Sequence, residues 1–577
     1  MDNLNQKLLT SLVLSAVLFG AVPAFSQAAP QANVNAAAVQ TQSAQKAPAL
    51  ANEEKEFAAG PHIAEVDVDG GHVQGYVRQG IYTYHGIPYA EAKERFTRAS
   101  KVTPWQGTRL AQDYGAISPQ KESEFPNTTW EQPARKFRMD NNCQNLNIWT
   151  PGLDKKARPV MVWLHGGGFE AGSSAETPVY DGANLSRKGD VVVVSVNHRL
   201  GVLGHLDLSA YGEKYADSAN AGIYDLIDAL TWIQKNIRAF GGNPQNVTIF
   251  GESGGGAKVL TLMDTPRAKG LFEKGIVESG ATDTMGETFM TSEVSRRVAE
   301  LTLKNLGLDA STVEKLQTVP YADLVAASDK ALQQAGEEFK IVRPLSTEYG
   351  LMWEPVVDGS FLPEQPVRMT GSRDIPLLIG NNRTEWESFP EIMNAARSQY
   401  DNKNTWSDTE IDKKLTEKYG ARKDAIVQEF LKAYPDKKKA DALYIDTMIR
   451  LPMKHLAENK ASQHGAPVYS YMFTWDAPVM GGVFMSYHTA EIPFVFHNIE
   501  AGANHIGAGR DAKKLETEMS QAWFNFARTG TPSAKGLPKW EPFTEESGAV
   551  MIFDQQPRLV HHHDDKLLEL VTAARKK

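Results

Sequence analysis

Residues 246–257 read NVTIFGESGGGA, and Ser253 stands near the middle of this stretch. Residues 247–250 form a short apolar and β-branched run that is typical of a buried strand. The run ends in the glycine-rich segment 251–255, and residues 257–260 then begin a predicted helix. The stretch therefore predicts a strand, a tight turn that carries Ser253, and a helix, which is the local structure of a nucleophile elbow.

The glycines that flank Ser253 have a steric explanation. A serine in so tight a turn packs against the neighbouring strand and helix, and side chains two residues to either side would collide with them. The short G-x-S-x-G pattern is weak on its own, because a glycine-rich surface loop can contain it by chance. A longer stretch of sequence is therefore needed to interpret it.

The longer run 240–255, FGGNPQNVTIFGESGG, resembles the active-site signature of the type-B carboxylesterase and cholinesterase-like family. The resemblance extends from about Gly86 to about Asp554. It implies an α/β-hydrolase fold, which is a mostly parallel central sheet flanked by helices, with helical insertions that form a gorge or lid.

The order of apolar runs supports this α/β class. Strand-like runs alternate with helical segments, which is typical of a parallel sheet with helices on both faces. Residues 62–84 predict an antiparallel ribbon with a turn at Gly70–Gly71, and regions 287–345 and 391–465 predict helical insertions. The predicted later strands are 158–164, 191–196, 275–280, 353–359, 375–380, 466–475 and 551–553, the last closing the sheet.

Length and composition favour a large globular domain. The chain has 577 residues, of which 41% are hydrophobic and 23% charged, so it can bury a sizeable core. Its net charge of −9 comes without blocks of like charge, which argues against a nucleic-acid partner. The oligomeric state is not predicted.

The first residues indicate export. Residues 1–28 have a short polar start, an apolar core and small residues at candidate cleavage sites, as in a secretory signal peptide. Polar and helix-breaking residues interrupt the apolar run, so we expect no stable membrane anchor. Residues 29–59 are predicted to be a flexible leader and residues 60–577 the hydrolase domain. The expected location is periplasmic or secreted.

Cys143 is the only cysteine, so no intrachain disulfide can form. Many members of the family carry a partner cysteine at the position of Ser118, and the resemblance therefore implies that Cys143 is a free, buried thiol. His561, His562 and His563 are adjacent in sequence and cannot converge on one tetrahedral ion. We predict that they are exposed, and we expect neither a metal nor a cofactor.

The strand 158–164 runs directly into the sequence HGGGF at residues 165–169. Acyl transfer needs backbone N–H donors for the developing oxyanion, and glycines at the end of a buried strand can supply them. The resemblance assigns these donors to Gly167, Gly168 and Gly254. It also gives Ser279 a supporting hydrogen bond to the triad, with a simple cap of the strand end as the open alternative. Glu252 is predicted to tune the field or hold water.

A serine nucleophile needs a general base and an orienting carboxylate. The segment 487–496, YHTAEIPFVF, resembles the part of the family that carries the base, which points to His488 rather than His497. Glu385 follows Gly380 at the spacing of the loop that carries the acid in the family. Thr384 and Trp386 replace the usual Asp and Gly there, and Glu387 remains an alternative acid.

These assignments predict a serine carboxylic ester hydrolase that acts on a small-molecule ester. His488 would take the Ser253 proton, an acyl-enzyme would form, and Glu385 would orient the imidazole. Two alternatives remain open. One is an amidase, thioesterase or lactonase that uses the same triad, and the other is a non-catalytic cholinesterase-like binding protein.

Overall fold

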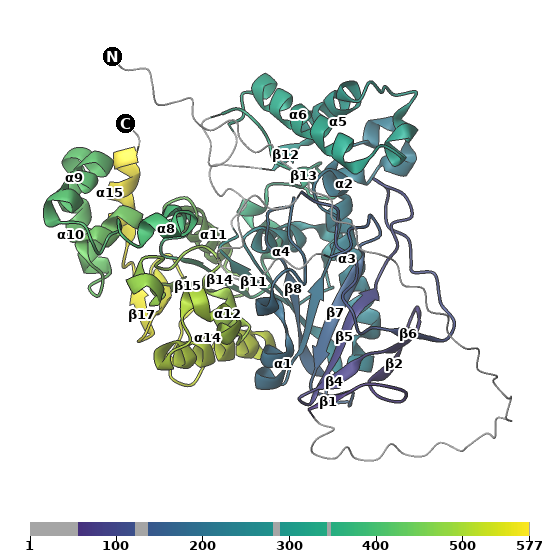
Figure 1. The fold of residues 1–577 in the computed structure, drawn as a ribbon, viewed down its shortest axis with the longest axis horizontal. Coiled ribbons are helices and arrows are strands. Elements are labelled where there is room, and N and C mark those ends of the chain that lie inside the picture. The colour runs from purple at the N-terminus through teal and green to yellow at the C-terminus, as the bar shows by residue number, and fades with distance from the viewer. Residues whose placement is uncertain (1–55, 122–136, 281–288, 343–347, 576–577) are drawn as a thin grey trace, which may run out of the picture. The chain divides into compact units, whose positions relative to one another are not determined.

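A central sheet of 12 strands organises the computed structural model, which describes residues 56–121, 137–280, 289–342 and 348–575 (Figure 1). Its strand order is β1-β4-β5-β7-β9-β8-β10-β11-β14-β15-β16-β17. All neighbours from β9 to β16 pair in parallel, whereas the outer strands pair antiparallel. The predicted mostly parallel sheet is confirmed.

The strands of this sheet are β1 (Phe57–Ala58), β4 (Tyr76–Arg78), β5 (Ile81–Pro88), β7 (Asn145–Thr150), β8 (Arg158–Leu164), β9 (Val192–Val196), β10 (Gly242–Glu252), β11 (Lys274–Glu278), β14 (Leu377–Asn382), β15 (Val468–Phe473), β16 (Ala549–Phe553) and β17 (Arg558–His561). A separate sheet contains β2 (Glu65–Val68), β3 (Gly71–Gln74) and β6 (Thr108–Leu110). Another contains β12 (Met290–Thr291) and β13 (Val356–Val357).

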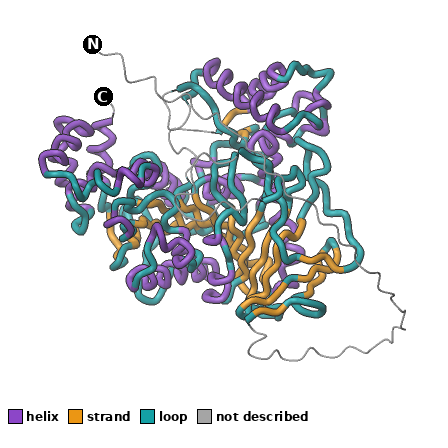
Figure 2. Tube along the Cα trace, in the orientation of Figure 1, coloured by secondary structure: helices purple, strands orange, loops and turns teal. Residues whose placement is uncertain are grey.

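Helices cover both faces of the central sheet (Figure 2). Val160 and Val162 of β8 point to a core shared with α3, α4 and α11. Met161 and Trp163 alternate with them and point to a second core shared with α1, α12 and α14. Every residue of β8 is buried, as expected of a parallel strand between two helical layers.

The helices are α1 (Ala183–Gly189), α2 (Gly201–His205), α3 (Ala221–Asn236), α4 (Gly254–Asp264), α5 (Ser292–Asn305), α6 (Tyr321–Phe339), α7 (Phe389–Met393), α8 (Ala395–Ser398), α9 (Asp408–Tyr419), α10 (Lys423–Ala433), α11 (Arg450–Ser462), α12 (Ile492–Val495), α13 (Ala503–Ile506), α14 (Arg510–Thr529) and α15 (Asp565–Arg575).

Both regions that were predicted as insertions are helical. Helices α5 and α6 pack on each other and on α2 through an apolar core of their own, and they lie together at the top of Figure 1. Helices α9, α10 and α15 form another core that also contains Val550 and Ile552 of β16. Whether either group moves as a lid over the site stays a prediction.

Several expected boundaries were wrong. Residues 57–58 pair with β4, so the sheet begins inside the segment predicted as a leader. Residues 356–357 pair with β12 in a separate sheet instead of returning to the central one. Strand β16 does not close the sheet, because β17 pairs with its outer edge. The ribbon at β2 and β3 is confirmed, with Gly71 already the first residue of its second strand.

The predicted signal peptide, residues 1–28, lies outside the residues that the structure describes. Among the described residues, the longest apolar helices are still too short or too polar to cross a lipid bilayer.

Candidate active site

Ser253 lies in the turn between β10 and α4, with φ of 56° and ψ of −126°. An L-residue at positive φ is strained, and hydrogen bonds on both sides hold this turn. The Ser253 N–H donates to the carbonyl of Glu278 at 2.8 Å, and its own carbonyl accepts from Ala257 N–H at 3.1 Å. Helix α4 begins at Gly254, three residues earlier than the sequence indicated. The predicted nucleophile elbow is present.

The flanking glycines allow the helix to sit close to the sheet. A Cβ atom on Gly255 would lie 2.0 Å from the carbonyl oxygen of Leu164 in β8, and one on Gly251 would lie 2.6 Å from the same oxygen. Contacts this short do not occur between real atoms, so larger residues would push α4 away from the strand. The steric explanation for the two glycines is therefore confirmed.

The glycine-rich loop after β8 approaches the start of α4. Gly167 and Gly168 have φ of 83° and 59°, which only glycine adopts without strain. A Cβ on Gly254 would lie 2.3 Å from the Gly168 carbonyl oxygen, so the two backbones meet with no side chain between them. The N–H of Gly254 is in the first turn of α4, where it has no acceptor within the helix. The structure thus brings all three predicted oxyanion donors together.

Glu385 and His488 form a short contact at the same edge of the sheet. Glu385 follows β14 and His488 follows the next strand, β15. The two segments are joined by a hydrogen bond of 3.2 Å from His488 N–H to the Glu385 carbonyl. The side chains meet with His488 Nδ1 2.6 Å from Glu385 Oε2. Glu387, the alternative acid, instead pairs with Lys418 at 2.7 Å.

Further hydrogen bonds fix the Glu385 carboxylate. Its Oε1 accepts from Ser279 Oγ at 2.7 Å and from the backbone N–H of Asn382 at 2.6 Å. Ser279 therefore makes the supporting contact that the family resemblance implied. Burial raises the pKa of Glu385, and these two hydrogen bonds act in the opposite direction. Donors on both carboxylate oxygens favour the ionised form.

Glu252 lies on the other side of the imidazole. Its Oε1 is 3.3 Å from His488 Nε2, and the structure gives Nε2 no hydrogen bond. None of the hydrogen bonds recorded between described residues joins Ser253 Oγ to His488. Burial, together with the negative charges of Glu491 and Glu385, raises the pKa of Glu252 well above its usual value. Its environment therefore favours the neutral form of the carboxyl group over the charged one.

Sequence reasoning missed two further buried carboxyl groups. Glu278 accepts a hydrogen bond from Trp523 Nε1 at 2.8 Å, and Glu491 accepts one from Asn382 Nδ2 at 2.6 Å. Burial raises the pKa of both groups. Their signal in the sequence was an isolated Glu inside an otherwise apolar run, since such a residue needs a buried polar partner.

Burial also determines the charge of His488. The side chain is 3% exposed, and burial lowers its pKa to about 4, although the charges of Glu491 and Asp446 oppose this shift. The imidazole is therefore neutral at pH 7. With Nδ1 directed at Glu385, the available nitrogen is Nε2, which can accept a proton.

An aromatic side chain stacks against this imidazole. The Trp386 ring centroid lies 4.4 Å from that of His488, with 32° between the ring planes. The ring centroids of Phe389 and Trp386 are also 4.4 Å apart. Both aromatic side chains are half-buried. The residue that replaces the usual glycine of the family thus places an aromatic surface beside the candidate base.

The other histidine candidates lie apart from Ser253. His497 Nδ1 is 3.1 Å from Ser520 Oγ, and its Nε2 is 3.6 Å from Glu516. The prediction that residues 561–563 are exposed is wrong for His563, whose side chain is 8% exposed beside Asp564. No group of His, Cys, Asp and Glu in the described part of the chain is arranged to hold a metal ion.

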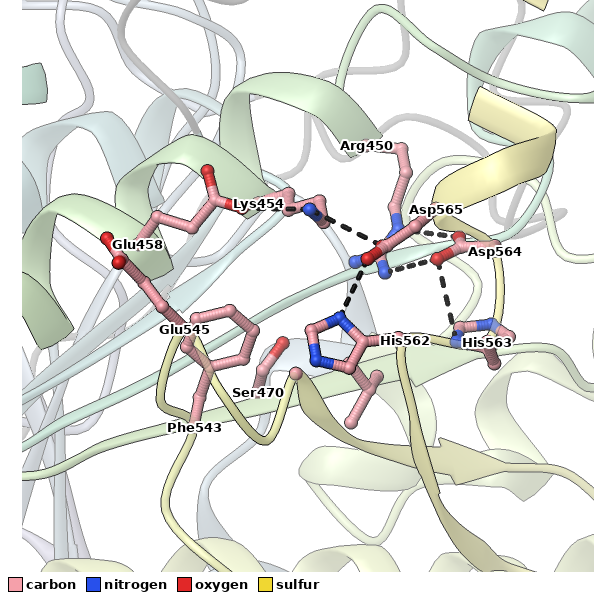
Figure 3. Close-up of a pocket in the computed structure, with 12 residues that line it drawn as sticks. Arg450, Lys454, Glu458, Ser470, Phe543, Glu545, His562, His563, Asp564 and Asp565 are labelled. Carbon is pink, nitrogen blue, oxygen red and sulfur yellow. Dashed lines mark hydrogen bonds and ion pairs between the residues drawn. The ribbon is translucent and has the colours of Figure 1, made fainter. Parts of the chain in front are cut away.

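A polar cavity of about 370 Å³ lies elsewhere, where α11 meets β15, β16 and the start of α15 (Figure 3). Arg450 faces Asp564 through two hydrogen bonds of 3.0 Å. Ser470 and His562 also line it, but both ring nitrogens of His562 are already bonded, to Asp565 and to the carbonyl of residue 546. His562 therefore has no free ring nitrogen to act as a general base for Ser470, and this cavity does not contain a serine–histidine pair for acyl transfer.

Comparison with known proteins agrees with the geometry around Ser253. The model of the carboxylesterase family matches residues 63–569. The chain belongs to this carboxylesterase family. It is 34% identical over 495 residues to para-nitrobenzyl esterase of Bacillus subtilis (strain 168), which covers 84% of this chain and 94% of that relative. It is also 30% identical to phenmedipham hydrolase of Pseudarthrobacter oxydans, over 84% of this chain and 93% of that protein.

Solved structures of carboxylesterases support the same conclusion. An esterase from anaerobic Clostridium hathewayi, which can hydrolyse aliphatic aromatic polyesters, superposes with a TM-score of 0.80 at 38% identity. The match covers 90% of this chain and 100% of that one. The carboxylesterase described here has the α/β-hydrolase fold and is a serine ester hydrolase, as the sequence predicted. These relatives support the prediction of an enzyme over the alternative of a non-catalytic binding protein.

Proposed function

We propose that this carboxylesterase acts through Ser253 as nucleophile, His488 as general base and Glu385 as the carboxylate that orients the base. The observation that carries the proposal is the 2.6 Å contact between His488 Nδ1 and Glu385 Oε2. It fixes the tautomer with Nε2 available, at the edge of the sheet where the elbow presents Ser253. Gly167, Gly168 and Gly254 are the proposed oxyanion donors.

The proton moves along a defined path. His488 Nε2 accepts the Ser253 proton while Oγ attacks the ester carbonyl, and the backbone donors stabilise the oxyanion. The resulting imidazolium protonates the leaving alcohol, which leaves an acyl-enzyme. Water then repeats the sequence, with His488 again as base, and releases the acid and free Ser253. Glu385 stabilises the imidazolium in both halves.

The open position of Nε2 supports this role. Since the structure gives Nε2 no hydrogen bond, the imidazole is free to bond Ser253 once substrate is bound. Catalytic hydrogen bonds are often long in free enzymes and tighten in the substrate complex. In this proposal the Glu252 carboxyl group, 3.3 Å from Nε2, is a polar neighbour of the imidazolium.

We further propose that the preferred substrates are esters with an aromatic group. Trp386 and Phe389 give the base an aromatic neighbour on which a ring can stack. The relatives named para-nitrobenzyl esterase and the polyester-hydrolysing esterase support the same class. An amidase or thioesterase that uses the same triad is the competing function.

The test compares Ser253→Ala with wild type on a panel of aryl esters, alkyl esters, anilides and thioesters. We expect wild type to prefer aryl esters, and Ser253→Ala to fold normally by circular dichroism while losing at least about 10³-fold in kcat/KM. Ser311→Ala, an exposed serine on the surface, is the matched control. A folded Ser253→Ala enzyme that keeps most of its activity would refute the triad, and anilides turned over best would indicate an amidase.

We also propose that the protein is exported and reaches the periplasm or the medium without residues 1–28. The support is the composition of these residues, with an apolar core followed by small residues. Amino-terminal sequencing of the mature protein from each cell fraction tests this. Protein recovered in the cytoplasm with residues 1–28 intact would contradict it.

A further inference from the structure

Lys258 is a buried lysine that the mechanism above does not use. It lies on α4 and is 0% exposed. None of the ion pairs recorded between described residues includes it. Its Nζ instead donates a hydrogen bond of 2.8 Å to the carbonyl oxygen of His165, the first residue of the glycine-rich loop. Burying an unpaired ammonium group is costly, so this contact requires an explanation.

The surroundings of Lys258 are suited to a cation without providing a salt bridge. The Phe169 ring lies 5.5 Å from Nζ, within the range of a cation–π contact. His165 and His198 stack with centroids 5.2 Å apart, and burial lowers the pKa of both and of His205, so all three rings are neutral. Burial lowers the pKa of Lys258 to about 7, and the charge of Glu176 acts in the opposite direction.

Lys258 and Gly254 are four residues apart on α4, so they lie on the same face of the helix. That face meets the glycine-rich loop twice. Gly254 touches the backbone of Gly168 near the far end of the loop, and Lys258 bonds the His165 carbonyl at its beginning. The loop is therefore attached to the helix that carries the nucleophile at both ends.

We propose that Lys258 is a positioning residue for the oxyanion hole, which holds the loop 165–168 against α4 so that its N–H groups and that of Gly254 converge on one point. The 2.8 Å hydrogen bond holds the start of the loop in place. In its protonated form the lysine makes a stronger hydrogen bond than a neutral donor, and it polarises the His165–Gly166 peptide that leads into the loop. This inference rests on the oxyanion assignment proposed above.

The role predicts a specific kinetic pattern. Oxyanion donors act on the transition state, so a displaced loop should lower kcat while KM changes little. Removing one donor outright costs about 10²–10³-fold, and a small misplacement can cost about 10²-fold. We therefore expect Lys258→Met to lower kcat between about 10-fold and 100-fold. Lys258→Gln keeps an N–H donor without the charge and should lose less.

Lys460 provides a matched control. It is also 0% exposed, and its Nζ donates to the carbonyl oxygens of Ser372 and Arg373 at 2.7 Å each. These carbonyls do not belong to the candidate site. Lys460→Met should therefore lower the melting temperature, as any loss of a buried lysine anchor does, without changing kcat on an aryl ester.

The experiment measures kcat, KM, melting temperature and the inhibition constant of an aryl trifluoromethyl ketone, whose adduct with a serine carries an oxyanion. In Lys258→Met the affinity for the ketone should fall by about the same factor as kcat/KM. A Lys258→Met enzyme with lowered melting temperature but wild-type kcat and ketone affinity would show a merely structural lysine and overturn the proposal.

Two other outcomes are also decisive. If KM alone rises, Lys258 acts on substrate binding and the proposal fails. If neither Lys258 variant folds while Lys460→Met does, the lysine is required for folding and the positioning role is rejected. The proposed triad is judged separately, by Ser253→Ala and by covalent attachment of the ketone to wild-type Ser253, so the two proposals can fail independently.

Discussion

At the residue scale, the site is dominated by carboxyl groups buried around one neutral imidazole. Glu252, Glu278, Glu385 and Glu491 are each at most 1% exposed. Several negative charges in one low-dielectric space repel each other, so they cannot all be ionised at once. Glu385 is the one with hydrogen-bond donors on both oxygens, which selects it as the carboxylate that orients His488.

Glu385 and Glu387 provide a sharp comparison at this scale. Glu385→Gln keeps the shape of the side chain but replaces the acceptor at His488 Nδ1, and it should lower kcat by about 10⁴-fold. Glu387→Gln only weakens a half-buried pair with Lys418 and should leave kcat within about twofold. Steady-state kinetics on an aryl ester would measure both. The reverse ranking would mean that the loop after β14 takes another path during catalysis.

The acid limb of the activity profile reports on His488. The base must be neutral to accept the serine proton, and burial lowers its pKa to about 4. Because the folded pKa is depressed, the imidazole stays neutral above it and becomes charged only as the pH falls through that value. We expect kcat/KM for an uncharged ester to decline with a midpoint well below 6.5. The profile needs a parallel check that the fold is intact, and a midpoint at or above 6.5 would contradict this prediction.

At the scale of elements, the junction of β10 and α4 places the nucleophile. Strand β10 ends at Glu252, the strained Ser253 follows, and helix α4 begins at Gly254. The neighbouring strand β8 lies in contact with the first turn of this helix. The same helix meets the loop after β8 through Gly254 and Lys258. Nucleophile and oxyanion donors are therefore held by one compact group of elements.

Gly255 tests how tightly this group is packed. Gly255→Ala would place a methyl group 2.0 Å from the Leu164 carbonyl, so α4 must move away from β8. We expect a loss of at least about 1–3 kcal/mol in the free energy of unfolding, together with reduced activity. Thermal and denaturant unfolding would measure the loss.

Gly509→Ala is the control for this substitution, because a Cβ there meets no atom within 4 Å. Because Gly509 is the N-cap of α14 and alanine is a poorer cap, the substitution should lower the stability by no more than about 1 kcal/mol. Equal effects of the two substitutions would show that the contact between α4 and β8 is not close.

At the scale of the whole molecule, stability comes from the cores and from buried ion pairs, without disulfides. The single cysteine, Cys143, is fully buried, and burial raises the pKa of its thiol. Ser118 lies beside it, and its hydroxyl oxygen accepts a hydrogen bond from the Leu200 N–H at 3.0 Å. Arg199 and Asp225 form a fully buried ion pair in the same region.

The Cys143 thiol should therefore be unreactive until the protein unfolds. We expect a reductant to leave the melting temperature and activity unchanged, and a thiol reagent to modify Cys143 only in denaturant, because the reactive thiolate is both inaccessible and disfavoured. Ellman titration of native and denatured protein measures this. Rapid labelling of the native enzyme, or a reductant-dependent loss of stability, would show that Cys143 is accessible or bonded to another chain.

The local elements followed from the sequence because their causes are local. The apolar run before Ser253 predicted a strand, the flanking glycines predicted the elbow, and the signature 240–255 resembled the family that the comparisons show. The alternation of strands and helices predicted the parallel sheet. Glu385 and His488 were predicted because the segments around them resemble those that carry the acid and the base in the family.

Only the tertiary structure decided which groups meet. Two features of the sheets depend on segments far apart in the sequence, namely the pairing of β13 outside the central sheet and the outer position of β17. The same is true of the burial of the His563 side chain and of the contacts made by Lys258, Glu278 and Glu491. A side chain's burial and partners are set by what the rest of the chain places against it, and the pKa of each group follows from that environment. The spacing of apolar residues in the sequence indicates whether a segment forms a helix or a strand, because that spacing follows the geometry of the element itself. Which other segments lie against that element is determined by long-range packing.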